Sequence, residues 1–299
     1  MRSPMRRPNI SSAVNPNNAA AAGLATSDAL TKRFFSDRSA YEMGLIRLAY
    51  TVPWLLAASL FISPAKTDGV FWSCVLVGLP LEVLSFLCYM KALKVSPLSL
   101  SLPFLAFTPG FIILTGWLIL GERLSAGGLA GIMLIIAGSY CLNISSLKQG
   151  ALQPFRAIIR EPGSRLMLLV SFIYAFTSTV GKLAILHSSP AYFGIVYYLL
   201  FTGLMFAGLA FIGKRSGNIL RTRTPAMALA LGATVAVTIF SHMLAISLTQ
   251  AAYMIALKRT SLLIGVLYGA WWFREEKIME RLTGASLMAT GALLIGLLG

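Results

Sequence analysis

The sequence predicts an all-α polytopic membrane protein with about ten transmembrane helices, nine of them strong, arranged as two inverted five-helix repeats. Three observations lead to this fold class: the composition, the length of the apolar runs and an internal duplication. Of the 299 residues, 57% are hydrophobic and 12% are charged, against about 45–50% and about 25% in ordinary globular domains. A chain with so few charges cannot cover the surface of an ordinary soluble protein.

The apolar runs have the length of membrane-spanning helices. A helix needs about 20 apolar residues to cross a hydrocarbon core that is ~30 Å thick. Nine runs approach or exceed this length: 42–62, 69–93, 97–120, 126–144, 166–186, 191–212, 225–248, 251–273 and 282–298. They are too long for barrel strands, and lipid requires every backbone polar group to be satisfied, so we expect helices.

The beginning of the chain fits this pattern poorly. Residues 1–27 contain Arg2, Arg6 and Arg7, and their apolar patch at 19–25 is too short to span a membrane. The patch is interpreted as the end of a weak first helix, and residues 1–20 as an atypical, disordered tail. A transit peptide is the alternative.

An internal duplication sets the domain organisation. A shift of 153 residues aligns 114–138 with 267–291 and gives seven identities in 25 positions, among them Gly131 with Gly284 and Gly138 with Gly291. We therefore expect a first repeat over 21–145, a linker over 146–165 and a second repeat over 166–299. Five helices per repeat is an odd number, so the second repeat must enter the membrane from the opposite side.

The basic residues agree with this inverted arrangement. The links that follow odd-numbered helices hold sixteen Lys and Arg residues, and those that follow even-numbered helices hold two, Lys66 and Arg123. The odd links are expected in the cytoplasm, which leaves the C-terminus outside. The net charge of +15 is therefore interpreted as a topology signal that meets lipid head groups, not nucleic acid. We expect an integral protein of a bacterial inner membrane, with an organellar envelope as the alternative.

Several motifs resemble a known transporter family. The stretches YMKAL at 89–93, TP at 108–109 and LGERLS at 120–125, with LKRTS at 257–261 in the second copy, are similar to the EamA-type repeats of the drug/metabolite transporter superfamily. The resemblance covers about residues 26–299 and implies ten helices in two inverted repeats. It also implies export or exchange of small metabolites, often amino acids or drugs. The weak first helix and the sequence FREE at 273–276 depart from the family pattern.

Among the charged residues within the predicted spans we single out four, together with one histidine: Arg47, Glu82, Lys258, Arg259 and His242. Each of the four charges costs ~2.5–3.5 kcal/mol at a helix centre that faces lipid, so they must face protein or a water-filled cavity. In one interpretation Glu82 pairs with a cation and braces the bundle. In the other they line a substrate-binding cavity, where Lys258 or Arg259 attracts an acid group and Glu82 takes a proton or an amine.

Two features refine this site. Lys258 and Arg259 are neighbours, so on a regular helix they point ~100° apart, and we expect one to bind substrate while the other pairs or snorkels. His242 titrates in the range that suits a proton relay, although packing is the simpler role for a lone histidine in a span.

Four residues are expected to be structural. Glu122 and Glu275 occupy matching short links, where a carboxylate can cap the N-terminus of the next helix. Gly131 and Gly284 lie in glycine-rich helices, where small residues allow close helix contact.

The predicted function is therefore a secondary transporter of small polar metabolites, such as amino acids, organic anions or drugs, by alternating access through a mid-membrane cavity. The expected partners are the substrate, membrane lipids and protons as a coupling ion. The sequence holds no familiar catalytic motif, and Cys74, Cys88 and Cys141 lack CxxC spacing, so we expect no catalytic residue, no metal and no cofactor. A membrane enzyme acting on lipid-linked substrates and a non-transporting relative remain the alternatives.

Overall fold

The computed structural model describes residues 10–96, 101–141, 161–212, 221–222, 224–273 and 278–299. Within these ranges every regular element is a helix. In chain order they are α1 (Ile10–Phe35), α2 (Ala40–Ala49), α3 (Val52–Ser59), α4 (Gly69–Val95), η1 (Leu102–Phe107), α6 (Thr108–Thr115), η2 (Gly116–Leu120), α7 (Ala126–Cys141), α10 (Pro162–Leu186), α11 (Pro190–Ile212), α13 (Pro225–Leu248), α14 (Ala251–Lys258), α15 (Ser261–Phe273) and α16 (Ile278–Leu298).

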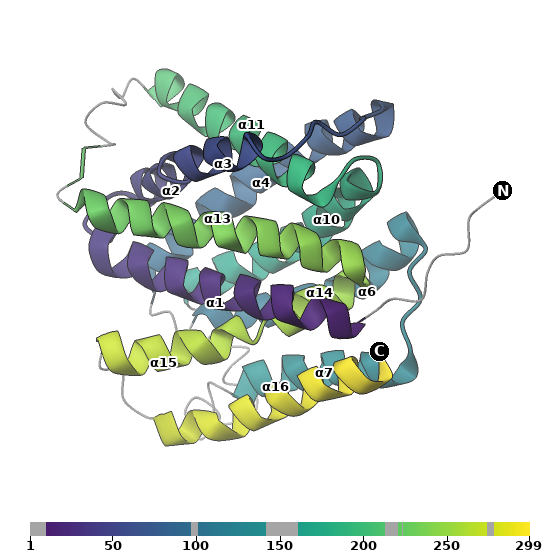
Figure 1. Ribbon diagram of the computed structural model, residues 1–299. Helices are drawn as coiled ribbons and strands as arrows, with labels where there is room; N and C mark the ends of the chain where they lie inside the picture. Colours follow the sequence, from purple (N-terminus) through teal and green to yellow (C-terminus); the bar gives the residue numbers. More distant parts are fainter. Residues whose placement is uncertain (1–9, 97–100, 142–160, 213–220, 223, 274–277) are drawn as a thin grey trace.

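The helices lie side by side as a bundle and run across the view in Figure 1. Four described helices, α4, α10, α11 and α13, are long and apolar enough to cross a membrane as single segments. Three other expected spans are broken: α2 continues into α3, η1 into α6 and η2, and α14 into α15. Shorter apolar stretches of α7 and α16 complete the set, which agrees with the predicted polytopic membrane fold.

The first helix differs from our expectation. We expect a disordered tail to residue 20, yet α1 begins at Ile10 and continues for 26 residues. It packs along α13 (Figure 1). Its low hydrophobicity has a physical reason, because its polar residues Asn17, Ser27, Asp28 and Thr31 are buried inside the bundle. Polar side chains can lie within a membrane protein when they face other helices that supply partners.

The helices α7 and α16 show that the two repeats are inverted. A Cβ atom on Gly131 would lie 2.7 Å from the carbonyl oxygen of Gly291, and one on Gly138 would lie 2.6 Å from that of Gly284. As residue numbers rise along α7 from 131 to 138, the numbers of their contact partners fall along α16 from 291 to 284, so the two helices are antiparallel. Adding 153 converts Gly131 into Gly284 and Gly138 into Gly291, so the shift of the duplication turns each contact into the other, as a two-fold axis would. The predicted opposed directions are thus confirmed for the described parts of the two matching segments that lie in α7 and α16.

A second pair of contacts follows the same symmetry. The Lys32 ammonium donates a hydrogen bond to the carbonyl of Ser96 at 2.6 Å, and the Lys182 ammonium donates one to the carbonyl of Thr249 at 2.5 Å. Ser96 and Thr249 are the C-caps of α4 and α13 and lie 153 residues apart, the spacing of the duplication. Each lysine therefore ties the first helix of its repeat to the end of the third helix.

The links between helices sort into two ends of the bundle. At the basic end, which holds residues 36–39 and 94–96, Lys94 donates to the carbonyl of Arg38, and Arg38 donates to the carbonyl of Arg221. At the opposite end, which holds residues 60–68, 121–125, 187–189 and 249–250, the Ser125 hydroxyl donates to the carbonyl of Leu298. The C-terminus therefore lies at the end whose links hold few Lys and Arg residues. Arg2, Arg6 and Arg7 lie outside the described residues.

Candidate functional site

The five residues predicted to form the site line one cavity. Glu82, Lys258, Arg259, Arg47 and His242 come from α4, α14, the turn after α14, α2 and α13. The cavity measures about 150 Å³, which is room for roughly ten water molecules or one small organic molecule. Both repeats therefore contribute to one site, as the interface of inverted repeats does in many transporters.

Arg47 does not pair with Glu82. One guanidinium nitrogen lies 2.8 Å from a carboxylate oxygen of Asp28, and the other donates to the Ser27 hydroxyl at 2.8 Å. Tyr89 donates its hydroxyl to the second oxygen of Asp28 at 2.5 Å. Only 8% of the Arg47 side chain and 4% of the Asp28 side chain are exposed. This network secures α2 and α4 to α1, and Asp28 was not among the residues that the sequence singled out.

Glu82 lies half-buried on the wall of the cavity near the middle of α4. It accepts a hydrogen bond from the Thr177 hydroxyl of α10 and interacts electrostatically with Lys258. Among the described residues it forms no ion pair within 4 Å. The interpretation in which Glu82 pairs with a cation and braces the bundle therefore lacks its partner.

Lys258 and Arg259 both line the cavity, although a regular helix would point them apart. Arg259 is the C-cap of α14 and keeps helical backbone angles, so the two side chains leave the helix in different directions and reach different partners on the cavity wall. The Lys258 ammonium lies 3.2 Å from Nδ1 of His242, which can accept this hydrogen bond while the imidazole is neutral. Arg259 donates to the Thr108 hydroxyl at 2.8 Å, and its Nε is buried without a hydrogen-bond partner among the described residues.

Two broken helices meet beside these cations. The boundary between η1 and α6 falls at Thr108, and α15 begins 153 residues later at Ser261. The breaks are thus equivalent positions of the two repeats, and the hydrogen bond between Arg259 and Thr108 joins them. Interrupted helices at mid-depth expose backbone ends and polar side chains to a cavity, an arrangement that recurs in secondary transporters.

Glu122 has a different contact from the one predicted. Its carboxylate accepts hydrogen bonds from the backbone N–H of Ala251, the first residue of α14, not from the helix that follows it in sequence. It also pairs with Lys182 at 2.5 Å. The N-terminus of α7 is capped instead by Ser125, whose hydroxyl accepts from Gly128. The short link carries Glu122 across to the other repeat, where it can meet both groups. Glu275 lies outside the described residues.

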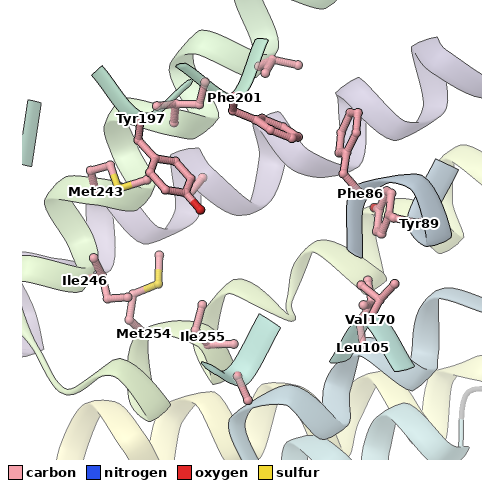
Figure 2. Packing of buried hydrophobic residues seen from close by; sticks show 14 of the residues in the cluster. Phe86, Tyr89, Leu105, Val170, Tyr197, Phe201, Met243, Ile246, Met254 and Ile255 are labelled. Atoms are coloured by element: carbon pink, nitrogen blue, oxygen red, sulfur yellow. The ribbon is translucent and has the colours of Figure 1, made fainter. Parts of the chain in front are cut away.

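The rest of the cavity wall is mainly aromatic and aliphatic. Phe86 and Phe201 pack edge to face with their ring centroids 5.3 Å apart. Figure 2 shows these two residues near each other, with Tyr197 beside Met243. Tyr174 and Tyr198 also line the cavity. Sequence reasoning missed these tyrosines because a tyrosine in an apolar run carries no charge that marks it as costly in lipid.

Two link residues at the opposite end also meet. Nδ1 of His187, the C-cap of α10, lies 2.7 Å from a carboxylate oxygen of Asp68. Asp68 is the N-cap of α4 and accepts the backbone N–H of Phe71. The hydrogen bond from Phe71 and then that from His187 hold the pKa of Asp68 below its usual range.

Residues 19–144 match the EamA-like transporter family. The match covers the first repeat, which is therefore similar to that family. Among curated proteins none matches significantly. One solved crystal structure superposes on this chain with a TM-score of 0.72, over 95% of this chain and 97% of the other, at 16% sequence identity. That likeness shows the shared fold. The EamA resemblance inferred from the motifs is confirmed, and so are the transmembrane and transporter character that it implies.

Proposed function

We propose that the protein is a secondary transporter that exports or exchanges small polar metabolites by alternating access through the described cavity. The observation that carries this proposal is the convergence of Glu82, Lys258 and Arg259, from both repeats, on one cavity near the middle of the bundle. Charges at this depth are expensive in lipid and mark substrate or ion pathways. A charged cavity between inverted repeats fits transport better than it fits a membrane enzyme or a scaffold.

The cavity approaches one end of the bundle only. Its lining includes Ile185 and Ile246, in the last turns of α10 and α13, and Phe193 in the first turn of α11. All three lie at the end whose links hold few Lys and Arg residues. Toward the basic end the lining stops at Arg47 and Tyr89, about two turns before the helix ends. Access from one side at a time is what alternating access requires.

Contacts close the basic end. Lys32 reaches the carbonyl of Ser96, the Ser96 hydroxyl donates to Glu161, and Arg38 donates to the carbonyl of Arg221. These bonds connect α1, α4 and the links before α10 and α13. If the charge distribution sets orientation as usual, this state faces outward, and the inward state would break some of these bonds.

Protons are the proposed coupling ion. Glu82 and His242 are titratable and line the cavity, and His242 is within hydrogen-bonding distance of Lys258. A proton that moves among such groups changes the charge that the substrate meets. An imposed pH gradient should therefore drive accumulation in vesicles, and accumulation that is indifferent to that gradient would exclude protons.

The experiment that tests transport uses purified protein in sealed vesicles. Uptake and efflux are measured for a panel of amino acids, organic anions and cationic drugs. The cavity variant is Ser178→Trp, which adds a large ring at a residue that lines the cavity. The matched control is Leu169→Trp on the same helix, α10, where the side chain is 45% exposed on the outer surface. Transport that Ser178→Trp abolishes and Leu169→Trp preserves supports the proposal, whereas no movement of any panel member would contradict it.

A further inference from the structure

The last turns of α15 carry an aromatic cluster at the basic end of the bundle. The cluster comprises Tyr268, Trp271 and Trp272; the ring centroids of Tyr268 and Trp272 lie 5.1 Å apart, and those of Trp271 and Trp272 lie 6.2 Å apart. The helix α15 packs mainly on α1, beside which it lies in Figure 1. The hydroxyls of Tyr268 and Thr26, 2.9 Å apart, join the two helices. Tryptophan and tyrosine rings at the ends of membrane helices lie at the level of the lipid head groups.

Arg33 places a cation on this cluster. Its guanidinium carbon lies 5.3 Å from the centroid of the Trp272 ring and 5.9 Å from that of the Phe34 ring. One guanidinium nitrogen donates to the carbonyl of Trp272, in the last turn of α15, at 3.2 Å. Arg33 is exposed, and the ion pairs among the described residues do not include it. The cation is therefore held in place while no described carboxylate neutralises it.

The guanidinium of Arg33 retains the capacity to bind an anion. An arginine has five N–H donors, and a described residue accepts a hydrogen bond from only one nitrogen of Arg33. A phosphate group can accept two parallel hydrogen bonds from a guanidinium. The basic end is the one that the positive-inside rule assigns to the cytoplasm, and the cytoplasmic leaflet is rich in anionic lipids. Charge and position therefore favour the phosphate of an anionic lipid as the partner of Arg33.

An exposed apolar face of α15 lies beside this cation. Leu267 is 63% exposed and Trp271 is 76% exposed. They are four residues apart, so they lie on the same side of the helix. A free phosphate ion would leave this face uncovered. A phospholipid would cover it with an acyl chain while its phosphate meets Arg33, so the combination favours a lipid over a small anion.

We propose that an anionic phospholipid of the cytoplasmic leaflet binds at the contact between α1 and α15, with its phosphate at Arg33 and an acyl chain along Leu267 and Trp271. This site is separate from the cavity, and the proposal does not depend on the transport function. The bound lipid would add contacts to α15, which follows the break beside Lys258 and Arg259.

Two tryptophans of the cluster provide the probe. The chain has five tryptophans, and replacing Trp54, Trp72 and Trp117 by Phe leaves Trp271 and Trp272 as the only ones. This protein is reconstituted in phosphatidylcholine vesicles that contain equal fractions of either phosphatidylglycerol or phosphatidylcholine with brominated acyl chains. Bromine quenches tryptophan fluorescence on contact. We expect the quenching to give phosphatidylglycerol a relative binding constant about fivefold higher, because one basic residue at the membrane surface is worth roughly that factor.

Variants of Arg33 separate a site from diffuse attraction. Arg33→Gln should bring the relative binding constant close to one. Arg33→Lys should keep part of the preference, because it retains the charge and loses the planar fork of donors. The matched control is Arg165→Gln, which removes the same charge from an exposed position in the first turn of α10. It should leave the fivefold preference unchanged.

Three results would overturn the proposal. The first is equal quenching by the two brominated lipids in the parent protein. The second is an equal loss of preference in Arg33→Gln and Arg165→Gln, which would indicate a diffuse positive surface. The third is loss of the preference when inorganic phosphate is added, compared with chloride at the same ionic strength, which would indicate a small-anion site. If Arg33→Gln does not fold, a preference in Arg33→Lys as strong as in the parent would contradict the proposed fork of hydrogen bonds.

Discussion

The buried ion pair between Asp28 and Arg47 offers a quantitative test of the packing of α1. The two side chains are 4% and 8% exposed and their charged atoms lie 2.8 Å apart. Replacing Asp28 by Asn leaves the Arg47 guanidinium buried without a counter-charge, which typically costs about 3–5 kcal/mol. The Tyr89 hydroxyl also loses a charged acceptor. In a domain of this size that loss corresponds to a fall in thermal midpoint on the order of 10 °C.

The assay is thermal unfolding of the purified protein in detergent. The double variant Asp28→Leu with Arg47→Met should recover most of the loss, because replacing both members of a buried pair with apolar residues is often neutral or stabilising. The control Asp37→Asn removes an exposed carboxylate that lies 3.8 Å from Arg38 and should change stability by less than about 1 kcal/mol. An Asp28→Asn variant as stable as the parent, or a double variant no better than that single one, would refute the reasoning.

Three further predictions concern packing, pH and topology. Gly291→Leu should destabilise the bundle by about 1–3 kcal/mol, because even a Cβ atom there would lie 2.5 Å from a backbone carbonyl oxygen. Gly296→Leu on the same helix should not, because a Cβ atom there would have nothing within 4 Å. Equal thermal midpoints of the two variants would contradict this prediction. Because the pKa of Asp68 is lowered in the folded protein, its stabilising effect should be present above its unfolded pKa and lost as the pH falls below about 4. Thermal midpoints of the parent and Asp68→Asn should therefore converge in acid, and a constant difference down to pH 3 would argue against it. A reporter fused after Gly299 should lie outside the cytoplasm, and a cytoplasmic reporter would reverse the assigned orientation.

Composition and spacing were sufficient to predict most of the fold and the residues of the cavity. The apolar runs and the 153-residue shift predicted the inverted repeats, because lipid leaves few alternatives to helices. The cost of charge in lipid identified Arg47, Glu82, Lys258 and Arg259, all of which line the cavity. Such costs are visible in a sequence because the penalty depends on residue type and depth.

Three features were not predictable in this way. The first helix has weak hydrophobicity because its polar side chains face inward, so hydropathy predicted only a weak helix there and gave no reason to single out Asp28. The hydrogen bond from Arg259, after the end of α14, to Thr108 at the break of the other repeat joins residues 151 positions apart, which no local pattern encodes. Lys182 was noticed only as a repeat match, although its partner Glu122 lies in a link of the other repeat.

The most direct test of alternating access is the accessibility of the cavity from each side of the membrane. A single cysteine is placed at Ser178, which lines the cavity, after Cys74, Cys88 and Cys141 are replaced by alanine. Oriented sealed vesicles are then treated with a membrane-impermeant thiol reagent on one face or the other. Alternating access predicts labelling from both faces and protection from both by a transported substrate. Labelling from one face alone under every condition, unaffected by substrate, would contradict it.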